Sequence, residues 1–156
     1  MMGDALPADH RVLRYVRPRY LESDGGDGPR IDGAAFLRRP AETGLSVNWL
    51  ECFDGTVPEQ VASVRKARRL AYAATAKLAR LNIGRVVQAI DGAGLGDTPA
   101  RIAHDPLDAA PPDHPLADPS HASITGVPVV DTPEGETIGD LIRRCVDQVF
   151  PARVDG

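Results

Sequence analysis

A histidine, two hydroxyls and a carboxylate stand together in the segment Asp118–Ser123 (Asp-Pro-Ser-His-Ala-Ser). The segment follows a proline-rich stretch and starts an alternating run of apolar and polar residues, so it should lie where a loop enters a strand. A histidine titrates near neutral pH, and a neighbouring hydroxyl or carboxylate can orient its ring. His121 is therefore a candidate general acid or base, with Ser123 or Asp118 as the orienting partner.

The same segment also has a structural interpretation. Asp118 and Ser120 can cap the loop through hydrogen bonds from nearby backbone amides, and His121 can be a hydrogen-bonded structural residue. The sequence shows no second catalytic motif that would match His121. We therefore expect the structural role for His121 and keep the catalytic role as the alternative.

Two resemblances involve this segment. His121-x-Ser123 resembles half of the paired His-x-Ser/Thr signature of two-histidine phosphoesterases, in which two such strands face one phosphate. None of the other histidines has Ser or Thr at the second following position, so the second half is absent. Leu45–Glu51 and Asp118–Ile124 are also similar to segments of a set of small uncharacterised bacterial proteins, a resemblance that implies no activity.

A second set of polar residues lies on the alternating run Leu45–Glu51 (Leu-Ser-Val-Asn-Trp-Leu-Glu). In a strand, Leu45, Val47 and Trp49 would share the packing face, while Ser46 and Asn48 would point the other way. If the protein is an enzyme, His121, Asn48, Ser46 and an arginine should converge in one concave pocket. Arg11 and Arg14 are the candidates for holding a phosphate.

Basic side chains gather in residues 57–81, which we predict to be one long amphipathic helix. On a helical wheel they fall on a different side from the apolar residues. This set could contact phosphates or an acidic protein surface, and it comprises Lys66, Arg69, Lys77 and Arg80, next to Arg65 and Arg68. Arg11, Arg14, Arg17 and Arg19 could extend it. A solvated helix face is the commoner meaning of such a pattern, because no aromatic residues that stack on bases are interleaved.

The cysteines and histidines give weaker signals. Cys52 lies among apolar residues, which suits an inert buried thiol better than a nucleophile paired with His121. Cys52 and Cys145 are too few for a disulfide framework. The spacing of His104, His114 and His121 matches no established pattern of metal ligands. We predict no metal and no cofactor.

The elements that must position these residues follow from hydrophobic periodicity and capping. We predict strands near 10–20, 31–37, 45–51, 85–90, 100–103 and 121–127, and helices over 57–81 and 133–149. Thr56-Val-Pro-Glu59 has the form of a capping box, and Thr132 precedes Pro133 as a helix cap. Residues 91–120 are rich in Pro, Gly and Asp and should form a long loop. The fold class is α+β: a single small domain spanning 1–156, with a mostly antiparallel or mixed sheet and two helices packed on it.

Composition limits the class of protein. The chain has 156 residues, of which 42% are hydrophobic and 26% charged, as in a folded globular protein. No apolar stretch is long enough to cross a bilayer, and the first residues do not look like a secretory signal. We therefore expect a cytoplasmic protein without membrane contact. Residues 1–90 carry 14 basic and 10 acidic side chains, whereas residues 91–156 carry 4 and 12.

From these patterns we expect a non-enzymatic interaction module or a subunit of a larger assembly, with a protein as partner. Nucleic acid could bind the basic N-terminal half, although the pI near 5.5 argues against a dedicated nucleic-acid binder. The alternative is a small hydrolase or phosphodiesterase that acts on a nucleotide or nucleic acid, with His121 as acid or base. The sequence leaves the oligomeric state open.

Overall fold

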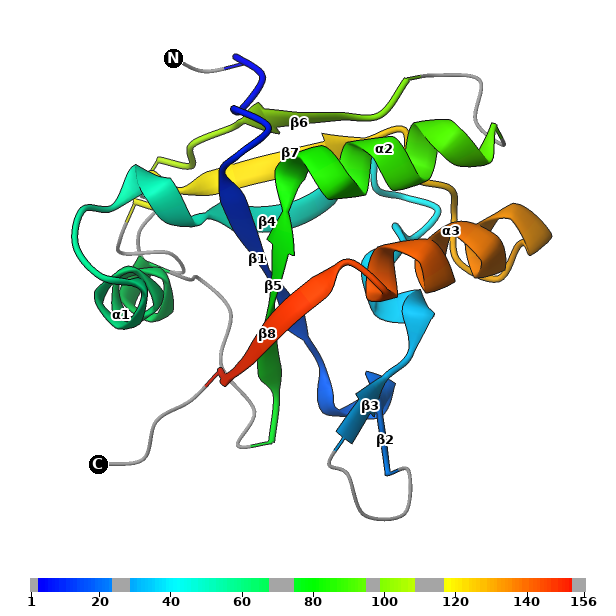
Figure 1. Cartoon of the computed structure of the whole chain (residues 1–156), viewed down its shortest axis with the longest axis horizontal. Helices are drawn as coiled ribbons and strands as arrows, with labels where there is room; N and C mark the ends of the chain where they lie inside the picture. Colours follow the sequence, from blue (N-terminus) through cyan, green and yellow to red (C-terminus); the bar gives the residue numbers. More distant parts are fainter. Residues whose placement is uncertain (1–2, 24–28, 68–74, 95–98, 109–116, 153–156) are drawn as a thin grey trace.

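The computed structural model describes residues 3–23, 29–67, 75–94, 99–108 and 117–152. Within them, a six-stranded antiparallel sheet has the strand order β6-β7-β4-β1-β5-β8 (Figure 1). Its strands are β1 (Arg11–Val16), β4 (Leu45–Trp49), β5 (Lys77–Asn82), β6 (Arg101–His104), β7 (His121–Thr125) and β8 (Val146–Pro151). A separate small hairpin pairs β2 (Leu21–Ser23) with β3 (Pro29–Ile31).

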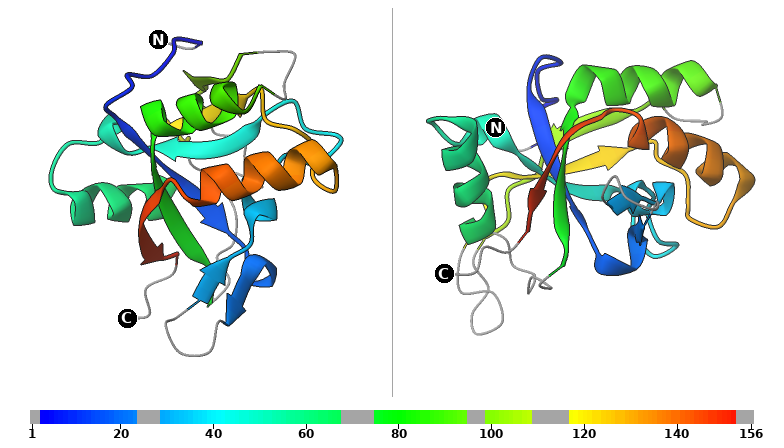
Figure 2. Two further views of the ribbon diagram at one scale, coloured as in Figure 1. Left: turned by 45° about the vertical axis from the view of Figure 1, so that its right-hand side comes forward. Right: turned by 60° about the horizontal axis from the view of Figure 1, so that its bottom comes forward.

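The helices cover both faces of the large sheet. The α-helices of the described residues are α1 (Val57–Ala67), α2 (Ile83–Ala93) and α3 (Pro133–Arg143), and the 3₁₀ turns are η1 (Pro18–Tyr20), η2 (Gly33–Phe36) and η3 (Leu50–Cys52). Figure 2 shows α2 and α3 side by side and α1 across the sheet from them. The α+β class and the antiparallel sheet are confirmed, whereas the prediction of two helices is wrong.

Side-chain alternation along the strands divides the core in two. Leu45 and Val47 of β4 belong to a large apolar cluster with residues of α2, α3 and η2. Leu13 of β1 and Leu78 of β5 point to the opposite face, where they join Val61 and other residues of the α1 side. A strand that exposes one face to each layer needs this alternation. The predicted packing face of β4 is confirmed.

Both predicted helix starts have the expected caps. At α1, the backbone amide of Thr56 donates to Glu59 Oε1 at 3.1 Å, and the amide of Glu59 donates to Thr56 Oγ1 at 3.4 Å. At α3, the amide of Gly135 donates to Thr132 Oγ1 at 3.0 Å, and Pro133 occupies the first turn. These bonds satisfy amides that an α-helix leaves without internal partners.

The predicted helix over 57–81 is wrong in its second half. Helix α1 ends at Ala67, residues 68–74 lie outside the described residues, and Lys77–Asn82 forms β5. Leu, Ala, Lys and Arg favour helices only weakly, by tenths of a kcal/mol each. Strand β5 is hydrogen-bonded on both sides, to β1 and to β8. That tertiary pairing outweighs the local preference.

The predicted strand over 85–90 is also wrong, because these residues belong to α2. Its β-branched residues suggested a strand, but Ile83, Val86 and Ile90 recur at helical spacing and are all buried. Asn82 caps the start of α2, where its Oδ1 accepts a hydrogen bond from the amide of Arg85 at 3.0 Å. The burial of this apolar face at helical spacing therefore favours a helix over a strand in residues 83–93.

Three further boundaries differ from the predictions. The last helix ends at Arg143 and not at 149, because the chain turns at buried Cys145 and returns as β8 beside β5. The strand expected over 31–37 is mostly η2, and only Ile31 lies in β3. The segment 91–120, predicted to be a loop with a short strand near 100–103, contains the end of α2 and the strand β6. None of the helices described is long and apolar enough to span a bilayer.

Candidate functional site

Strands β4 and β7 bring the polar residues of the two alternating segments onto one face. Their antiparallel register places Ser46 opposite Ser123 and Asn48 opposite His121. Directly opposed residues in an antiparallel pair project to the same side of the sheet, and long side chains also reach their diagonal neighbours. The imidazole of His121 can therefore cross to Ser46, two residues along β4 from Asn48.

The imidazole of His121 contacts Ser46 on one side and the backbone of Asp105 on the other, and the contact with Asp105 fixes its tautomer. His121 Nε2 lies 3.1 Å from Ser46 Oγ, and Nδ1 lies 2.8 Å from the backbone carbonyl oxygen of Asp105. A carbonyl oxygen only accepts hydrogen bonds, so Nδ1 carries the proton of the neutral ring. Nε2 then presents its lone pair to the hydroxyl of Ser46. The side chain of His121 is only 12% exposed, which limits competition from water.

Asp105 holds the far side of the ring. Its backbone amide donates to the carbonyl of His121 at 2.9 Å, and its Oδ2 lies 3.7 Å from His121 Nδ1. Ser123, predicted to orient His121, instead donates to Asp105 Oδ2 at 3.4 Å. The orienting contact thus comes from Asp105, with Ser123 behind it. Asp105 lies 16 residues before His121 with no motif linking them, and sequence reasoning missed this role.

Asp118 makes a different set of bonds from the one that a catalytic role at His121 needs. Its Oδ1 accepts from the amide and hydroxyl of Ser120, and its Oδ2 accepts from Asn48 Nδ2 at 2.9 Å. Asn48 Nδ2 also donates to Ser120 Oγ at 2.8 Å. All three side chains are almost completely buried. The predicted local cap is present for Asp118, which accepts from the amide of Ser120, whereas the Ser120 hydroxyl bonds to the side chains of Asp118 and Asn48.

A cavity of about 340 Å³ opens beside Ser46 and His121. Asp118 forms part of its wall, and Asn48 lies beneath that wall through its bond to Asp118. Arg14 also borders the cavity, with Nε and Nη1 donating to the carbonyls of Ala35 and Ser46. The convergence expected of an enzyme is therefore present for His121, Ser46 and an arginine.

Further arginines enlarge the positive wall of this cavity. Arg17, Arg19 and Arg39 border it together with Arg14, whereas its acidic lining residues are Glu42 and Asp118. Glu42 is already engaged by the amide of Arg39 at 2.8 Å and by its guanidinium at 3.8 Å. The sequence had placed Arg17 only in an extended basic set, and Arg39 had no signal. An anionic group would be attracted to this wall.

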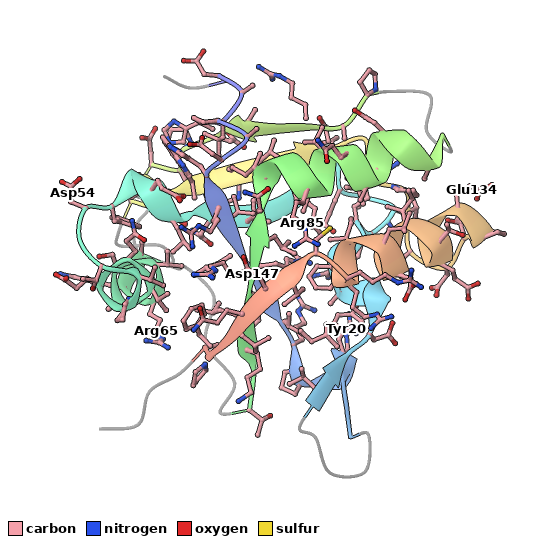
Figure 3. The ribbon with its side chains drawn as sticks, in the orientation of Figure 1. Tyr20, Asp54, Arg65, Arg85, Glu134 and Asp147 are labelled. Atoms are coloured by element: carbon pink, nitrogen blue, oxygen red, sulfur yellow. The ribbon has the colours of Figure 1, made fainter. Side chains whose placement is uncertain are left out.

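The other predicted binding residues lie elsewhere. Arg11 contacts Glu51, with 3.7 Å between Nε and Oε2. Lys66 is on α1, Lys77 and Arg80 are on β5, and Arg69 lies outside the described residues. Arg80 is paired with Asp147 at 2.6 Å, and Figure 3 labels Asp147 on β8. The four basic residues therefore do not form one helix face, and any role in binding stays a prediction.

Cys52 lies close to the polar cluster but has the properties of an inert thiol. Its Sγ donates to the carbonyl of Pro119 at 3.5 Å. Burial and the nearby charge of Asp118 raise the pKa of the Cys52 thiol, so the nucleophilic thiolate is disfavoured. Among the residues that the structure describes, no group of three or more histidines, cysteines and carboxylates is placed to hold a metal ion.

Comparisons of the chain with models of protein families, with curated proteins and with solved structures gave no match.

Proposed function

We propose that the protein is a small hydrolase of phosphate esters, with Ser46 as nucleophile and His121 as general base and acid. One observation carries the proposal: the Ser46 Oγ to His121 Nε2 contact of 3.1 Å at the wall of an arginine-rich cavity. A hydroxyl, a base within hydrogen-bond reach and a third group that orients the base are the elements of nucleophilic catalysis. The non-enzymatic interaction module stays an untested prediction.

The proposed reaction begins with the ester phosphorus beside Ser46. Oγ attacks phosphorus while its proton passes to His121 Nε2, and the ester bond to the leaving alcohol breaks. The imidazolium then returns the proton to the leaving alkoxide. Water, deprotonated by the same Nε2, attacks the phosphorus of the phosphoserine, and the bond between phosphorus and Oγ breaks. The imidazolium gives its proton to Ser46 Oγ, which releases the phosphate product and restores both side chains. Asp105 is a positioning residue, because its backbone carbonyl accepts the hydrogen bond from His121 Nδ1 and so keeps the Nδ1 proton in place.

The arginine wall supplies the electrostatic part of the proposal. Negative charge is spread over the phosphate oxygens throughout the reaction, and fixed guanidinium groups stabilise it without reorganisation. Arg14 is held rigidly against the carbonyls of Ala35 and Ser46. A guanidinium so placed lies close to the proposed nucleophile. The same wall would disfavour neutral esters, which gain nothing from the positive charge.

The test is turnover by the purified full-length chain. Its substrates would be a chromogenic phosphate monoester, a chromogenic phosphodiester, and cyclic and linear nucleotides. We expect Ser46→Ala and His121→Ala each to lower kcat by about 10²-fold or more.

The matched control is Ser63→Ala, because Ser63 lies on α1 and its hydroxyl bonds only within that helix, to the carbonyl of Glu59. It should turn over substrate like the wild type. Circular dichroism must show that all variants are folded. The proposal fails if the folded wild type hydrolyses none of these esters, or if Ser46→Ala retains wild-type kcat.

A further inference from the structure

The residues that line the cavity beside Ser46 are of two chemical kinds, which we call the arginine wall and the apolar wall. The arginine wall comprises the guanidinium groups, and the apolar wall comprises Tyr20, Leu37, Leu107 and Val130. Simple phosphate would use only the first wall. A ligand that fills both must join an anion to a flat or apolar part.

Two guanidinium groups of the arginine wall, those of Arg17 and Arg19, are available to bind an anion. The guanidinium of Arg17 makes no hydrogen bond or ion pair within the described residues, although Arg17 borders the cavity. Arg19 is exposed and contacts only Tyr20 among them. Both acidic residues of the lining are already bonded, Glu42 to Arg39 and Asp118 to Asn48 and Ser120. An anionic ligand would therefore meet two guanidinium groups, those of Arg17 and Arg19, that pair with no carboxylate of the described residues.

The apolar wall contains one aromatic ring, that of Tyr20, which is in contact with the guanidinium of Arg19. Arg19 Cζ lies 4.8 Å from the centroid of the Tyr20 ring, and Arg19 Nη2 donates to Tyr20 Oη at 2.8 Å. Tyr20 lies near the β2–β3 hairpin, at the end of η1 (Figure 3). Tyrosine rings and guanidinium planes are the groups on which nucleobases stack.

The size and composition of the cavity favour a single nucleotide over a polymer. About 340 Å³ is at the lower end of small-molecule pockets. Binding of a nucleic-acid strand needs a basic groove with successive aromatic platforms, but only 4% of this chain is aromatic. A mononucleotide needs one platform and one anion site, both of which border this cavity.

We infer that the substrate is a mononucleotide, with its phosphate on the arginine wall beside Ser46 and its base on the wall of Tyr20, Leu37 and Val130. This inference rests on the proposed hydrolase function for the position of the phosphate. It adds a binding role for Tyr20, which the proposed chemistry does not need.

Calorimetric titration of Ser46→Ala tests the inference without requiring turnover. The ligands would be AMP, GMP, CMP and UMP, with ribose 5-phosphate as the ligand that lacks a base and adenosine as the one that lacks phosphate. We expect at least one nucleotide to bind about tenfold or more tightly than ribose 5-phosphate, the factor that stacking of one base provides. It should also bind more tightly than adenosine, which lacks the phosphate that the arginines would hold. A ten-residue oligothymidylate should bind more weakly than that nucleotide.

Second substitutions in the Ser46→Ala background locate the two parts of the ligand. Tyr20→Leu keeps an apolar wall but removes the ring, so it should weaken nucleotide binding about tenfold and leave ribose 5-phosphate unchanged. Arg17→Gln should weaken both phosphate ligands by a similar factor. Arg85→Gln is the matched arginine control, because Arg85 is an exposed residue of α2 that does not border the cavity (Figure 3).

Several results would overturn the inference: equal affinity for nucleotides and ribose 5-phosphate, tighter binding of the oligonucleotide, absence of all binding, or equal effects of Tyr20→Leu on both ligands. Failure of this inference and failure of the proposed hydrolase function give different results. Nucleotide binding by Ser46→Ala with no hydrolysis by the wild type would remove the hydrolase and leave a nucleotide-binding protein. Hydrolysis of chromogenic esters without preference for a base would leave the hydrolase and remove the nucleotide.

Discussion

Asn48 Nδ2 lies 2.9 Å from Asp118 Oδ2, and both side chains are almost completely buried, with 1% and 3% of their surfaces exposed. The two residues are 70 positions apart in the sequence. Their hydrogen bond attaches the loop before β7 to the strand that carries Ser46. A buried carboxylate is stable only while its hydrogen-bond donors are in place. The bond therefore supports both the fold and the wall of the cavity.

We expect Asn48→Ala to lower the free energy of unfolding by about 2–4 kcal/mol, because it removes a donor from a buried carboxylate. Urea denaturation measures the loss. Asn82→Ala is the matched control, since Asn82 caps α2 at a half-exposed position and its loss should cost about 1 kcal/mol. Similar losses for both variants would show that the Asn48–Asp118 bond contributes no more than a helix cap.

Gly139→Ala tests the close approach of α3 to η2. A Cβ atom at Gly139 would lie 2.7 Å from the carbonyl oxygen of Gly33, and backbone there cannot move without separating the two elements. We expect a loss of about 1–3 kcal/mol in unfolding free energy. Gly92→Ala is the contrasting variant, because a Cβ there meets open space in α2. Gly92→Ala should stabilise the protein by about 0.5–1 kcal/mol. A Gly139→Ala variant with the same free energy of unfolding as the wild type would contradict the close packing of α3 on η2.

Arg80 and Asp147 form a pair between β5 and β8, with side chains 14% and 32% exposed. Arg80→Glu should destabilise the protein by about 1–3 kcal/mol, because it places two carboxylates together in a partly desolvated position. The double variant Arg80→Glu with Asp147→Arg should recover much of that loss in a thermal melt. Lys66→Glu, at an exposed position of α1, should change stability by less than about 0.5 kcal/mol. An equal effect of Lys66→Glu would argue against the ion pair.

Cys52 should react slowly with alkylating reagents at neutral pH. Burial raises the pKa of its thiol, and the negative charge of Asp118 raises the pKa further. A raised pKa means that the thiolate appears only at higher pH than for an ordinary cysteine, so the alkylation rate should rise late with pH. The rate is measured with iodoacetamide in a Cys145→Ala background. Fast alkylation near pH 7 would show a thiolate and reopen a nucleophilic role for Cys52.

Local sequence patterns predicted the structure correctly where it depends on the apolar face of a single strand or on a helix-capping residue. Alternation placed Leu45 and Val47 in the core and Ser46 on the other face, and the caps at Thr56 and Thr132 formed as predicted. These signals act between residues two to four positions apart, so they can be read without knowledge of the partners.

Tertiary structure decided the rest. Residues 77–82 form a strand and residues 83–93 a helix, because β5 pairs with two strands and α2 buries an apolar face, and both effects exceed intrinsic propensity. The candidate site is equally non-local: Ser46 and His121 are 75 positions apart, and Arg17 and Arg39 come from two other segments. The sequence by itself determined the residue types of the site and the faces of its two strands. The approach of Ser46 to His121 and the arginines depends on which strands pair and in which register. The energy that selects this pairing comes from packing between segments far apart in the chain.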